Sequence, residues 1–178
     1  MDRLSPIEQR FILHWGEMGT RWGINRTVAQ IHALLYLSAR PLNAEEIAET
    51  LSVARSNVST SLRELQNWGI VKIVHVMGDR RDHFESMKDV WEMFRVIVRE
   101  RKRREIDPTL TVLRECVEEA GKSESLDPAT KDRMTGALDF FETMTSWYEQ
   151  LSRMPTGSII RFVKMGDKVF KLVGSSSE

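Results

Sequence analysis

The chain has 178 residues, which fits one domain, or one domain with an oligomerisation extension, at roughly 150 residues per domain. Its 26 Lys and Arg balance 26 Asp and Glu, which excludes a histone-like polycation but permits a local basic surface that binds nucleic acid. Hydrophobic residues at 41% and charged residues at 29% indicate a folded globular protein rather than a disordered or collagen-like chain.

The sequence lacks the marks of membrane insertion and of secretion. No stretch approaches the roughly 18 uncharged apolar residues of a membrane span, and residues 1–6 lack the apolar core of a secretory signal. The single cysteine, Cys116, excludes an internal disulfide framework and a multi-cysteine zinc site. Carboxylates near Cys116 disfavour its thiolate, so we expect a packed thiol rather than a redox switch. These features predict a cytoplasmic protein with no membrane partner.

Two helices are predicted at the start of the chain. Ser5 is a good N-cap and Pro6 suits the first helical turn, so a helix begins there. Three glycines weaken this helix, which we end near residues 19–22. Asn25 caps a second helix with a wide apolar stripe, and the Arg40-Pro41 pair ends it because proline disfavours helical geometry in the preceding residue.

Two shorter helices follow. Asn43, with Glu46 three residues later, forms a variant of the capping box and opens a helix through Leu51. Ser52 is predicted to cap the next helix, which stops at Trp68-Gly69. Residues 70–76 are β-branched and predict a strand, residues 77–81 a charged turn, and residues 82–85 the returning strand.

The rest of the chain is predicted to be helical. One helix covers Asp89 to about Ile106, a break falls at Asp107-Pro108, and a continuation reaches Gly121. Residues 123–127 form a linker before a helix from Pro128 to about residue 153, and a last amphipathic segment follows. Its apolar positions are Ile159, Phe162, Val163, Val169 and Phe170.

This order of elements predicts a mainly α fold with a small β-hairpin: a winged helix-turn-helix with flanking dimerisation helices. Residues 24–88 are assigned to the winged helix-turn-helix DNA-binding domain. Residues 1–23 and 89–173 are assigned to a helical dimerisation region, and residues 174–178 to a disordered tail.

The helix after Ser52 has the composition of a DNA reader. Val58, Leu62 and Leu65 form an apolar side that holds it against the domain, and no carboxylate precedes Glu64. Short hydroxyls, an amide and two guanidinium groups on the other side suit phosphates and base edges. The predicted DNA-binding residues of this helix are Arg55, Ser56, Asn57, Ser59, Thr60 and Arg63. The alternative is a Ser-rich exposed surface of no special purpose.

Two further cations lie in the charged turn of the hairpin. Arg80 and Arg81 are predicted to reach the adjacent minor groove or the DNA backbone. The alternative is a local charge balance with Asp79 or Asp82 in a solvated turn. The basic run at residues 101–104 is interpreted as a solvated helix face.

Four segments carry a family resemblance. They are Leu42–Ala48, Val53–Ser59, Leu62–Val71 and Gly78–Arg81, and they resemble the MarR superfamily of bacterial transcription regulators. Trp68-Gly69 and the Gly-Asp-Arg turn are similar to its GbsR-like branch. The match covers roughly residues 6–105. The resemblance implies a homodimeric repressor of genes for choline uptake and glycine betaine or ectoine synthesis, bound to double-stranded DNA at a pseudopalindromic operator.

Other chemistries find little support in the sequence. The four histidines stand at no metal-ligand spacing, so no metal is predicted. His75 and His83 could face each other across the hairpin, where we expect surface residues. No phosphate-binding loop, nucleophile elbow or zinc-protease helix is present, so neither an enzyme nor a cofactor is predicted.

The five tryptophans allow two interpretations. The simpler is core packing. The other is an aromatic cage for a quaternary ammonium effector such as choline or a betaine, because ring faces attract cations that donate no hydrogen bonds. The predicted effector-binding residues are Trp15, Trp22, Tyr36 and Trp91, the last at the hinge where the hairpin returns into a long helix.

Two classes of function therefore remain. The first is a sequence-specific DNA-binding repressor relieved by a small effector. The alternative is a winged-helix module for protein–protein assembly, without direct operator binding. An assembly surface should be apolar or acidic, whereas Arg55, Asn57 and Arg63 favour DNA.

Overall fold

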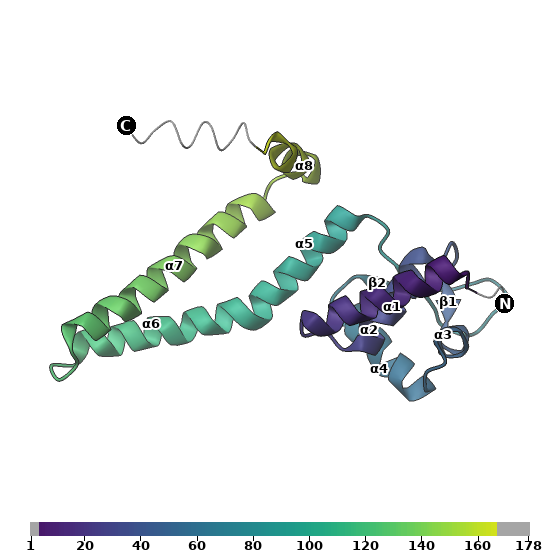
Figure 1. The fold of residues 1–178 in the computed structure, drawn as a ribbon, viewed down its shortest axis with the longest axis horizontal. Coiled ribbons are helices and arrows are strands. Elements are labelled where there is room, and N and C mark those ends of the chain that lie inside the picture. The colour runs from purple at the N-terminus through teal and green to yellow at the C-terminus, as the bar shows by residue number, and fades with distance from the viewer. Residues whose placement is uncertain (1–3, 167–178) are drawn as a thin grey trace. The chain divides into compact units, whose positions relative to one another are not determined.

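The computed structural model describes residues 4–166 and divides the chain into two compact units, 1–97 and 98–178, which we take in turn. The fold is mainly helical with a small antiparallel sheet, and the predicted fold class is confirmed (Figure 1). Val169, Phe170 and the predicted tail at 174–178 lie outside the described residues. Within residues 4–166, no helix is both long enough and apolar enough to cross a membrane.

Four helices build most of unit 1, at nearly the predicted positions. They are α1 (Pro6–Arg21), α2 (Arg26–Leu37), α3 (Ala44–Leu51) and α4 (Arg55–Asn67). Ser5 and Asn25 cap α1 and α2 through their side chains. The predicted box at the start of α3 forms in both directions, with Asn43 accepting from the Glu46 amide and Glu46 accepting from the Asn43 amide.

The predicted cap of α4 was wrong. Ser52 ends α3 rather than starting α4, since its φ of 53° is left-handed and its amide bonds back to the carbonyls of Ala48 and Glu49. Ala54 occupies the N-cap of α4 and provides no side-chain hydrogen bond. A residue with left-handed backbone angles turns the chain sharply out of a helix. The sequence predicted Ser52 as an N-cap only because serine is frequent at that position.

The sheet has three short strands in the order β1-β3-β2. The predicted hairpin is present as β2 (Val71–Val74) and β3 (His83–Ser86). An edge strand, β1 (Leu42–Asn43), was not predicted, because a strand of two residues leaves no recognisable pattern in the sequence. Val74 pairs with His83, so His75 lies beyond the ladder. The two histidines therefore do not face each other, and the expectation of surface residues holds for His75 but was wrong for His83, which is buried.

Helix α2 forms the centre of unit 1. Ile31 and Leu35 are fully buried in it, and α1, α3, α4 and β3 all pack on this helix. α1 approaches closely because Gly19 faces Ala29, where an added Cβ would lie 2.5 Å from the Ala29 Cβ. Gly19, one of the glycines that weaken α1 in the sequence, therefore serves its packing.

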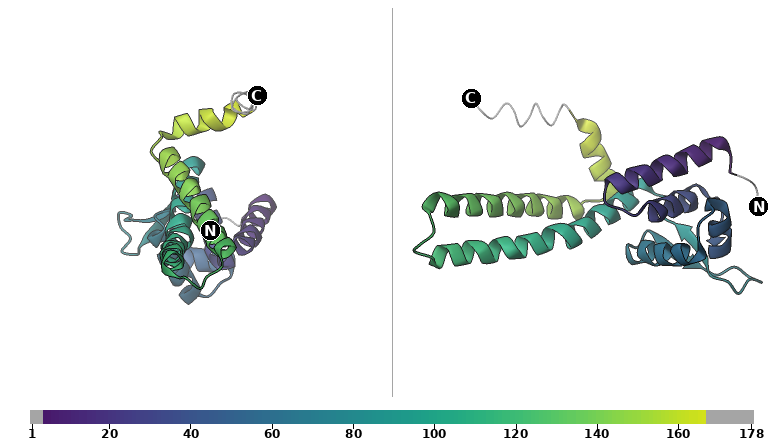
Figure 2. Two further views of the ribbon diagram at one scale, coloured as in Figure 1. Left: turned by 90° about the vertical axis from the view of Figure 1, so that its left-hand side faces the viewer. Right: turned by 60° about the horizontal axis from the view of Figure 1, so that its bottom comes forward.

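A long helix leaves unit 1 and continues into unit 2. α5 (Val90–Arg101), a π-helical turn (Lys102–Ile106) and α6 (Asp107–Lys122) follow without interruption (Figures 1 and 2). The predicted break at Asp107-Pro108 was wrong. The amide of Asp107 bonds to the carbonyl of Lys102, and this wider turn accommodates Pro108, which lacks an amide hydrogen and would clash with a carbonyl in a regular helix.

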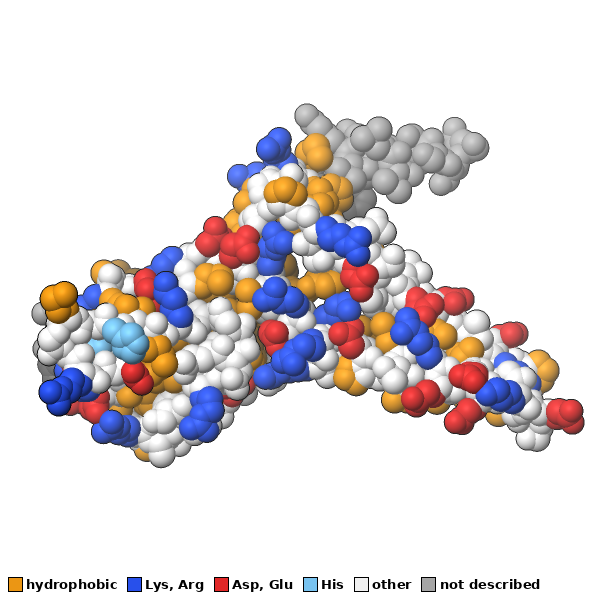
Figure 3. Space-filling view, turned by 180° about the vertical axis from the view of Figure 1, so that it is seen from behind, with side chains coloured by type: hydrophobic (Ala, Val, Ile, Leu, Met, Phe, Trp, Pro, Cys, Tyr) orange, Lys and Arg blue, Asp and Glu red, His pale blue; other side chains and the backbone are white. Residues whose placement is uncertain are grey.

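Unit 2 contains a helical hairpin and a terminal helix. α6 packs against α7 (Pro128–Ser152), which begins after the predicted linker, and α8 (Thr156–Met165) follows. Arg114 and Glu142 join the two hairpin helices at 2.9 Å. Residues 108–152 hold four basic and nine acidic residues, and acidic side chains extend along the hairpin at the right of Figure 3. Cys116 is half-buried.

The basic run at the junction of α5 and α6 is not a free cationic patch. Arg101 pairs with Glu105, Lys102 with Asp107 at 2.6 Å, and Arg103 with Glu100 at 2.7 Å. These pairs agree with the interpretation of the run as an ordinary helix face.

The packing at Gly19 gives a prediction for stability. Gly19→Ala should destabilise unit 1 by about 1–3 kcal/mol in urea unfolding, because the new methyl group overlaps the buried Ala29. Gly136→Ala is the control: nothing lies within 4 Å of its Cβ in α7, so removing a helical glycine should stabilise unit 2 by about 0.5–1 kcal/mol. Equal effects of the two variants would contradict this account of the α1–α2 contact.

Candidate nucleic-acid interface and aromatic pocket

Helix α4 has one buried face and one exposed face. Val58, Ser61, Leu62 and Leu65 are buried where α4 packs on α2 and α3. All of the helix residues predicted to bind DNA are exposed: Arg55, Ser56, Asn57, Ser59, Thr60 and Arg63. The first turn of α4 carries no acidic residue and its N-cap is Ala54, so the positive end of the helix dipole is open to an anion.

The two arginines of α4 differ in their surroundings. The Arg55 guanidinium pairs with the Glu45 carboxylate of α3 at 2.7 Å, and the Ser59 hydroxyl donates to the Arg55 carbonyl at 3.1 Å. Arg63 forms no ion pair within residues 4–166. An exposed ion pair contributes only about 0–1 kcal/mol, so Arg55 can exchange Glu45 for a phosphate.

The turn between β2 and β3 projects from unit 1 (Figure 2) and is fixed by Asp79. Arg81 donates to both carboxylate oxygens of Asp79 through Nε and Nη2, the latter at 2.6 Å. These hydrogen bonds hold the pKa of Asp79 well below its usual range. The buried His83 ring completes the turn, with Nδ1 3.0 Å from the Arg81 carbonyl and Nε2 3.5 Å from Asp79 Oδ2.

The predicted wing cations therefore differ. Arg81 is exposed but charge-balanced, and its partner is Asp79 rather than Asp82. Arg80 is exposed and makes no ion pair with the described part of the chain. Of the two, Arg80 is the cation that an incoming phosphate meets unopposed.

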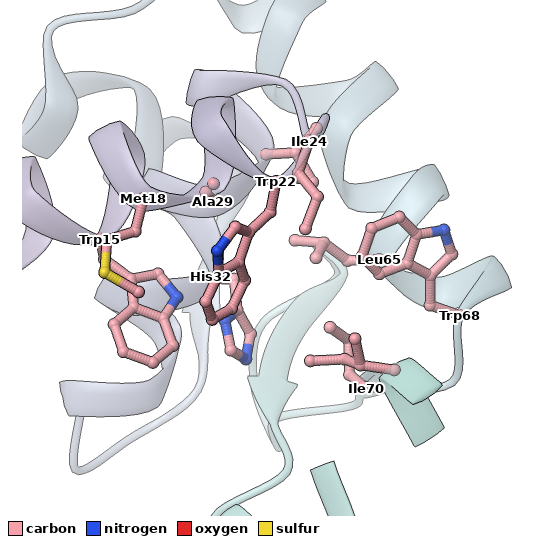
Figure 4. Close-up of a pocket in the computed structure, with 12 residues that line it drawn as sticks. Trp15, Met18, Trp22, Ile24, Ala29, His32, Leu65, Trp68 and Ile70 are labelled. Carbon is pink, nitrogen blue, oxygen red and sulfur yellow. The ribbon is translucent and has the colours of Figure 1, made fainter. Parts of the chain in front are cut away.

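An apolar cavity of about 50 Å³ lies inside unit 1. The side chains of Trp15, Trp22 and His32 lie on one side of it in Figure 4, and those of Leu65, Trp68 and Ile70 lie on the other. Its wall comes from α1, α2, the end of α4 and the chain entering β2, together with Ile97 of α5. Its lining contains no carboxylate.

His32 is the ionisable group in this wall. It is buried, and its Nε2 has no hydrogen-bond partner within residues 4–166. Burial, followed by the nearby Lys88 cation, lowers the pKa of His32 to about 4. The ring is therefore neutral near pH 7, and the pocket holds no positive charge that would repel a cation.

The structure brings together part of the predicted aromatic set. Trp15 and Trp22 line the pocket, whereas Tyr36 and Trp91 do not. The Tyr36 ring lies 6.4 Å from the His32 ring, and Trp91 is half-buried on α5. Trp68 lines the pocket and was missed, because in the sequence it marked only the end of a helix. Within the described residues, no cluster of three or more His, Cys, Asp or Glu side chains could hold a metal.

The three helices α2–α4, the hairpin wing and the polar exposed face of α4 define a winged helix-turn-helix of the DNA-binding class. Residues 22–82 match the model of the MarR family. This part of the chain is similar to MarR-family regulators, and the chain as a whole is similar, at low identity, to GbsR-like proteins, in agreement with the resemblance seen in the sequence.

Its relatives are regulators rather than enzymes. The chain is 25% identical to the HTH-type transcriptional repressor GbsR of Bacillus subtilis (strain 168), over 83% of this chain and 85% of that protein. It is 19% identical to the HTH-type transcriptional repressor OpcR of the same organism, over 100% and 95%. A crystal structure of a transcriptional regulator shares the fold, with a TM-score of 0.66 and 20% identity, over 83% of this chain and 96% of that one.

The burial of His32 predicts a pH-dependent stability. The folded-state pKa of His32, about 4, lies below the ordinary value of 6.5, so the unfolded chain binds the proton first as the pH falls. Stability is full above pH 6.5 and decreases toward pH 4. Between pH 7 and pH 5 the free energy of unfolding should fall by about 2 kcal/mol from this group alone.

His32→Phe tests this by urea unfolding at the two pH values, since phenylalanine fills the site without binding a proton. The variant should lose that part of the pH dependence. His14→Phe, at an exposed position of α1, is the matched control and should keep it. Identical pH slopes for wild type and His32→Phe would contradict the assignment.

Proposed function

We propose that the chain is a homodimeric repressor that binds a pseudopalindromic operator in double-stranded DNA, with α4 as the reader and Arg80 and Arg81 in the wing. The observation that carries this proposal is the exposed face of α4, which is polar and cationic over an apolar buried face. The names of the relatives GbsR and OpcR, both transcriptional repressors, support it.

The same face argues against the alternative of an assembly module. A stable protein interface has an apolar centre that is depleted of charge. The exposed side of α4 offers hydroxyls, an amide and two arginines instead. Such groups donate to phosphates and to base edges, with Arg suited to guanine and Asn57 to adenine.

Dimerisation through residues 1–23 and 89–173 would cover apolar surface left open in a single chain. Phe140, Met144 and Trp147 share one face of α7 and are 60%, 47% and 52% exposed. Val90 and Phe94 on α5 are 51% and 59% exposed. A second copy on these helices would place two reading helices on one side of the DNA, about 34 Å apart.

DNA binding can be tested on the operator, located by footprinting DNA upstream of the protein's own gene. Arg63→Ala should weaken binding by about 1–3 kcal/mol per half-site if the arginine contacts a base in bidentate fashion. Arg80→Ala should weaken binding to all sequences and reduce its salt dependence, and by more than Arg81→Ala, since Asp79 already balances Arg81.

Fluorescence anisotropy at several salt concentrations measures these effects, and sedimentation gives the number of chains on each duplex. Arg133→Ala, at an exposed position of α7, is the control. Unchanged affinity when Arg63, Arg80 and Arg81 are all replaced would refute this DNA surface. A stable monomer at micromolar concentration would refute the dimer.

We further propose that choline or a betaine relieves repression by binding the aromatic pocket, and that the regulated genes serve osmoprotectant uptake or synthesis. The indoles of Trp15 and Trp22 offer faces to a quaternary ammonium, and the neutral His32 does not repel it. A cavity of about 50 Å³ is small for such a ligand, since benzene occupies one of roughly 150 Å³. Trp22 is 52% exposed and is the wall residue at the surface, where a change of its rotamer would enlarge the pocket.

The effector is tested by titrating choline and glycine betaine in a calorimeter, and by operator release in anisotropy. Trp22→Ala should remove the response and leave DNA affinity within about twofold, because it lies away from the exposed face of α4. Trp91→Ala tests the hinge position in the same way. Absence of binding heat with every quaternary ammonium compound, together with unaltered release in both variants, would leave these aromatics as core residues only.

A further inference from the structure

Lys88 makes an unusual set of contacts at the junction of the wing and the long helix. It lies between β3 and α5 in sequence, and its Nζ donates to the main-chain carbonyls of Leu35 at 2.8 Å, Tyr36 at 2.9 Å and Ser38 at 2.7 Å. These carbonyls form the C-terminal end of α2, 50 or more residues earlier in the chain.

The three contacts use all three donors of the ammonium group and give each carbonyl a hydrogen-bond partner. The last carbonyls of a helix have no partner within the helix, and an ammonium group has three donors. A cation at this end is also favoured by the helix dipole. Partial burial lowers the pKa of Lys88. Its Nζ nevertheless donates hydrogen bonds to all three carbonyls.

The residues on either side of Lys88 bind two other elements. The amide of Met87 donates to the Ile70 carbonyl, at the entry to β2, at 2.9 Å. Asp89 accepts from the amides of Trp91 and Glu92 at 2.8 and 3.1 Å and so caps α5. Three consecutive residues therefore join the sheet, α2 and α5.

Apolar packing alone would leave the direction of α5 poorly defined. Met93 and Val96 anchor α5 in the core of unit 1, but hydrophobic contacts are not directional. Hydrogen bonds are directional, and the side-chain bonds of Lys88 link the root of α5 to α2. α2 in turn supports α4.

We propose that Lys88 is a positioning residue that fixes the reading helix relative to α5, and so sets the half-site spacing that the dimer accepts. This inference rests on the proposed function as a dimer on two half-sites. Lys88 does not contact DNA in this mechanism. It determines the half-site spacing at which both reading helices of the dimer can bind DNA at the same time.

The experiment compares three duplexes: the operator, the operator with two base pairs inserted between its half-sites, and a single half-site. Wild type should prefer the operator over the inserted duplex. Lys88→Met keeps the length of the side chain but removes its donors, and should reduce that preference by about tenfold or more, as expected when charge-assisted hydrogen bonds are lost. Its affinity for the single half-site should stay within about twofold of wild type.

Two further variants complete the test. Lys72→Met, on β2 with a side chain 73% exposed, is the matched control and should keep the wild-type preference. Lys88→Arg keeps the charge, but its planar fork cannot follow three converging carbonyls, so it should behave like Lys88→Met.

The outcomes separate the possibilities. Unchanged spacing preference in Lys88→Met would overturn the inference. Loss of half-site binding as large as the loss of operator binding would also overturn it, since Lys88 would then be only a structural cap. A wild-type protein that binds the operator no better than a single half-site would refute the proposed dimeric function itself.

Discussion

The burial of most of α2 is the constraint on which the rest of unit 1 depends. Seven of its twelve residues are buried, so α1, α3, α4 and β3 must pack on it and cannot shift independently. Close packing transmits small displacements because interiors contain few voids. The same helix carries His32 in the pocket wall and receives Lys88 at its end. Helix α4, the pocket wall and the junction at Lys88 therefore all contact α2.

The cationic surface is built with its own counter-charges. Glu45 holds Arg55 and Asp79 holds Arg81, while Arg63 and Arg80 have no ion pair within residues 4–166. Paired guanidinium groups lose less side-chain entropy when they meet a phosphate, since their geometry is already restricted. Arg63 and Arg80 attract a phosphate more strongly, because no carboxylate has to be displaced first. A chain with no net charge can thus present a local surface suited to nucleic acid.

Local patterns in the sequence predicted the helices, the Asn43 cap, the hairpin and the two faces of α4. What they missed depends on partners distant in the chain or on geometry rather than residue type. Lys88 was predicted only as the start of the hinge before the long helix, because its acceptors lie 50 or more positions away. Trp68 lines the pocket only because α4 packs on α2 in the folded chain. Pro108 predicted a break because a π turn cannot be recognised from composition.

The position of His32 on α2 relates the pocket to the junction. His32 precedes by about one helical turn the carbonyls of Leu35 and Tyr36 that accept from Lys88, and the Lys88 cation contributes to the low pKa of His32. If an effector binds the pocket as proposed, a shift of the backbone at His32 would reach the last turn of α2 through the same helix. Moving that turn changes the three acceptors of Lys88, and with them the root of α5. A ligand shifts an equilibrium only through different affinity for its two states, and the position of this turn is the difference that the proposed effector would recognise.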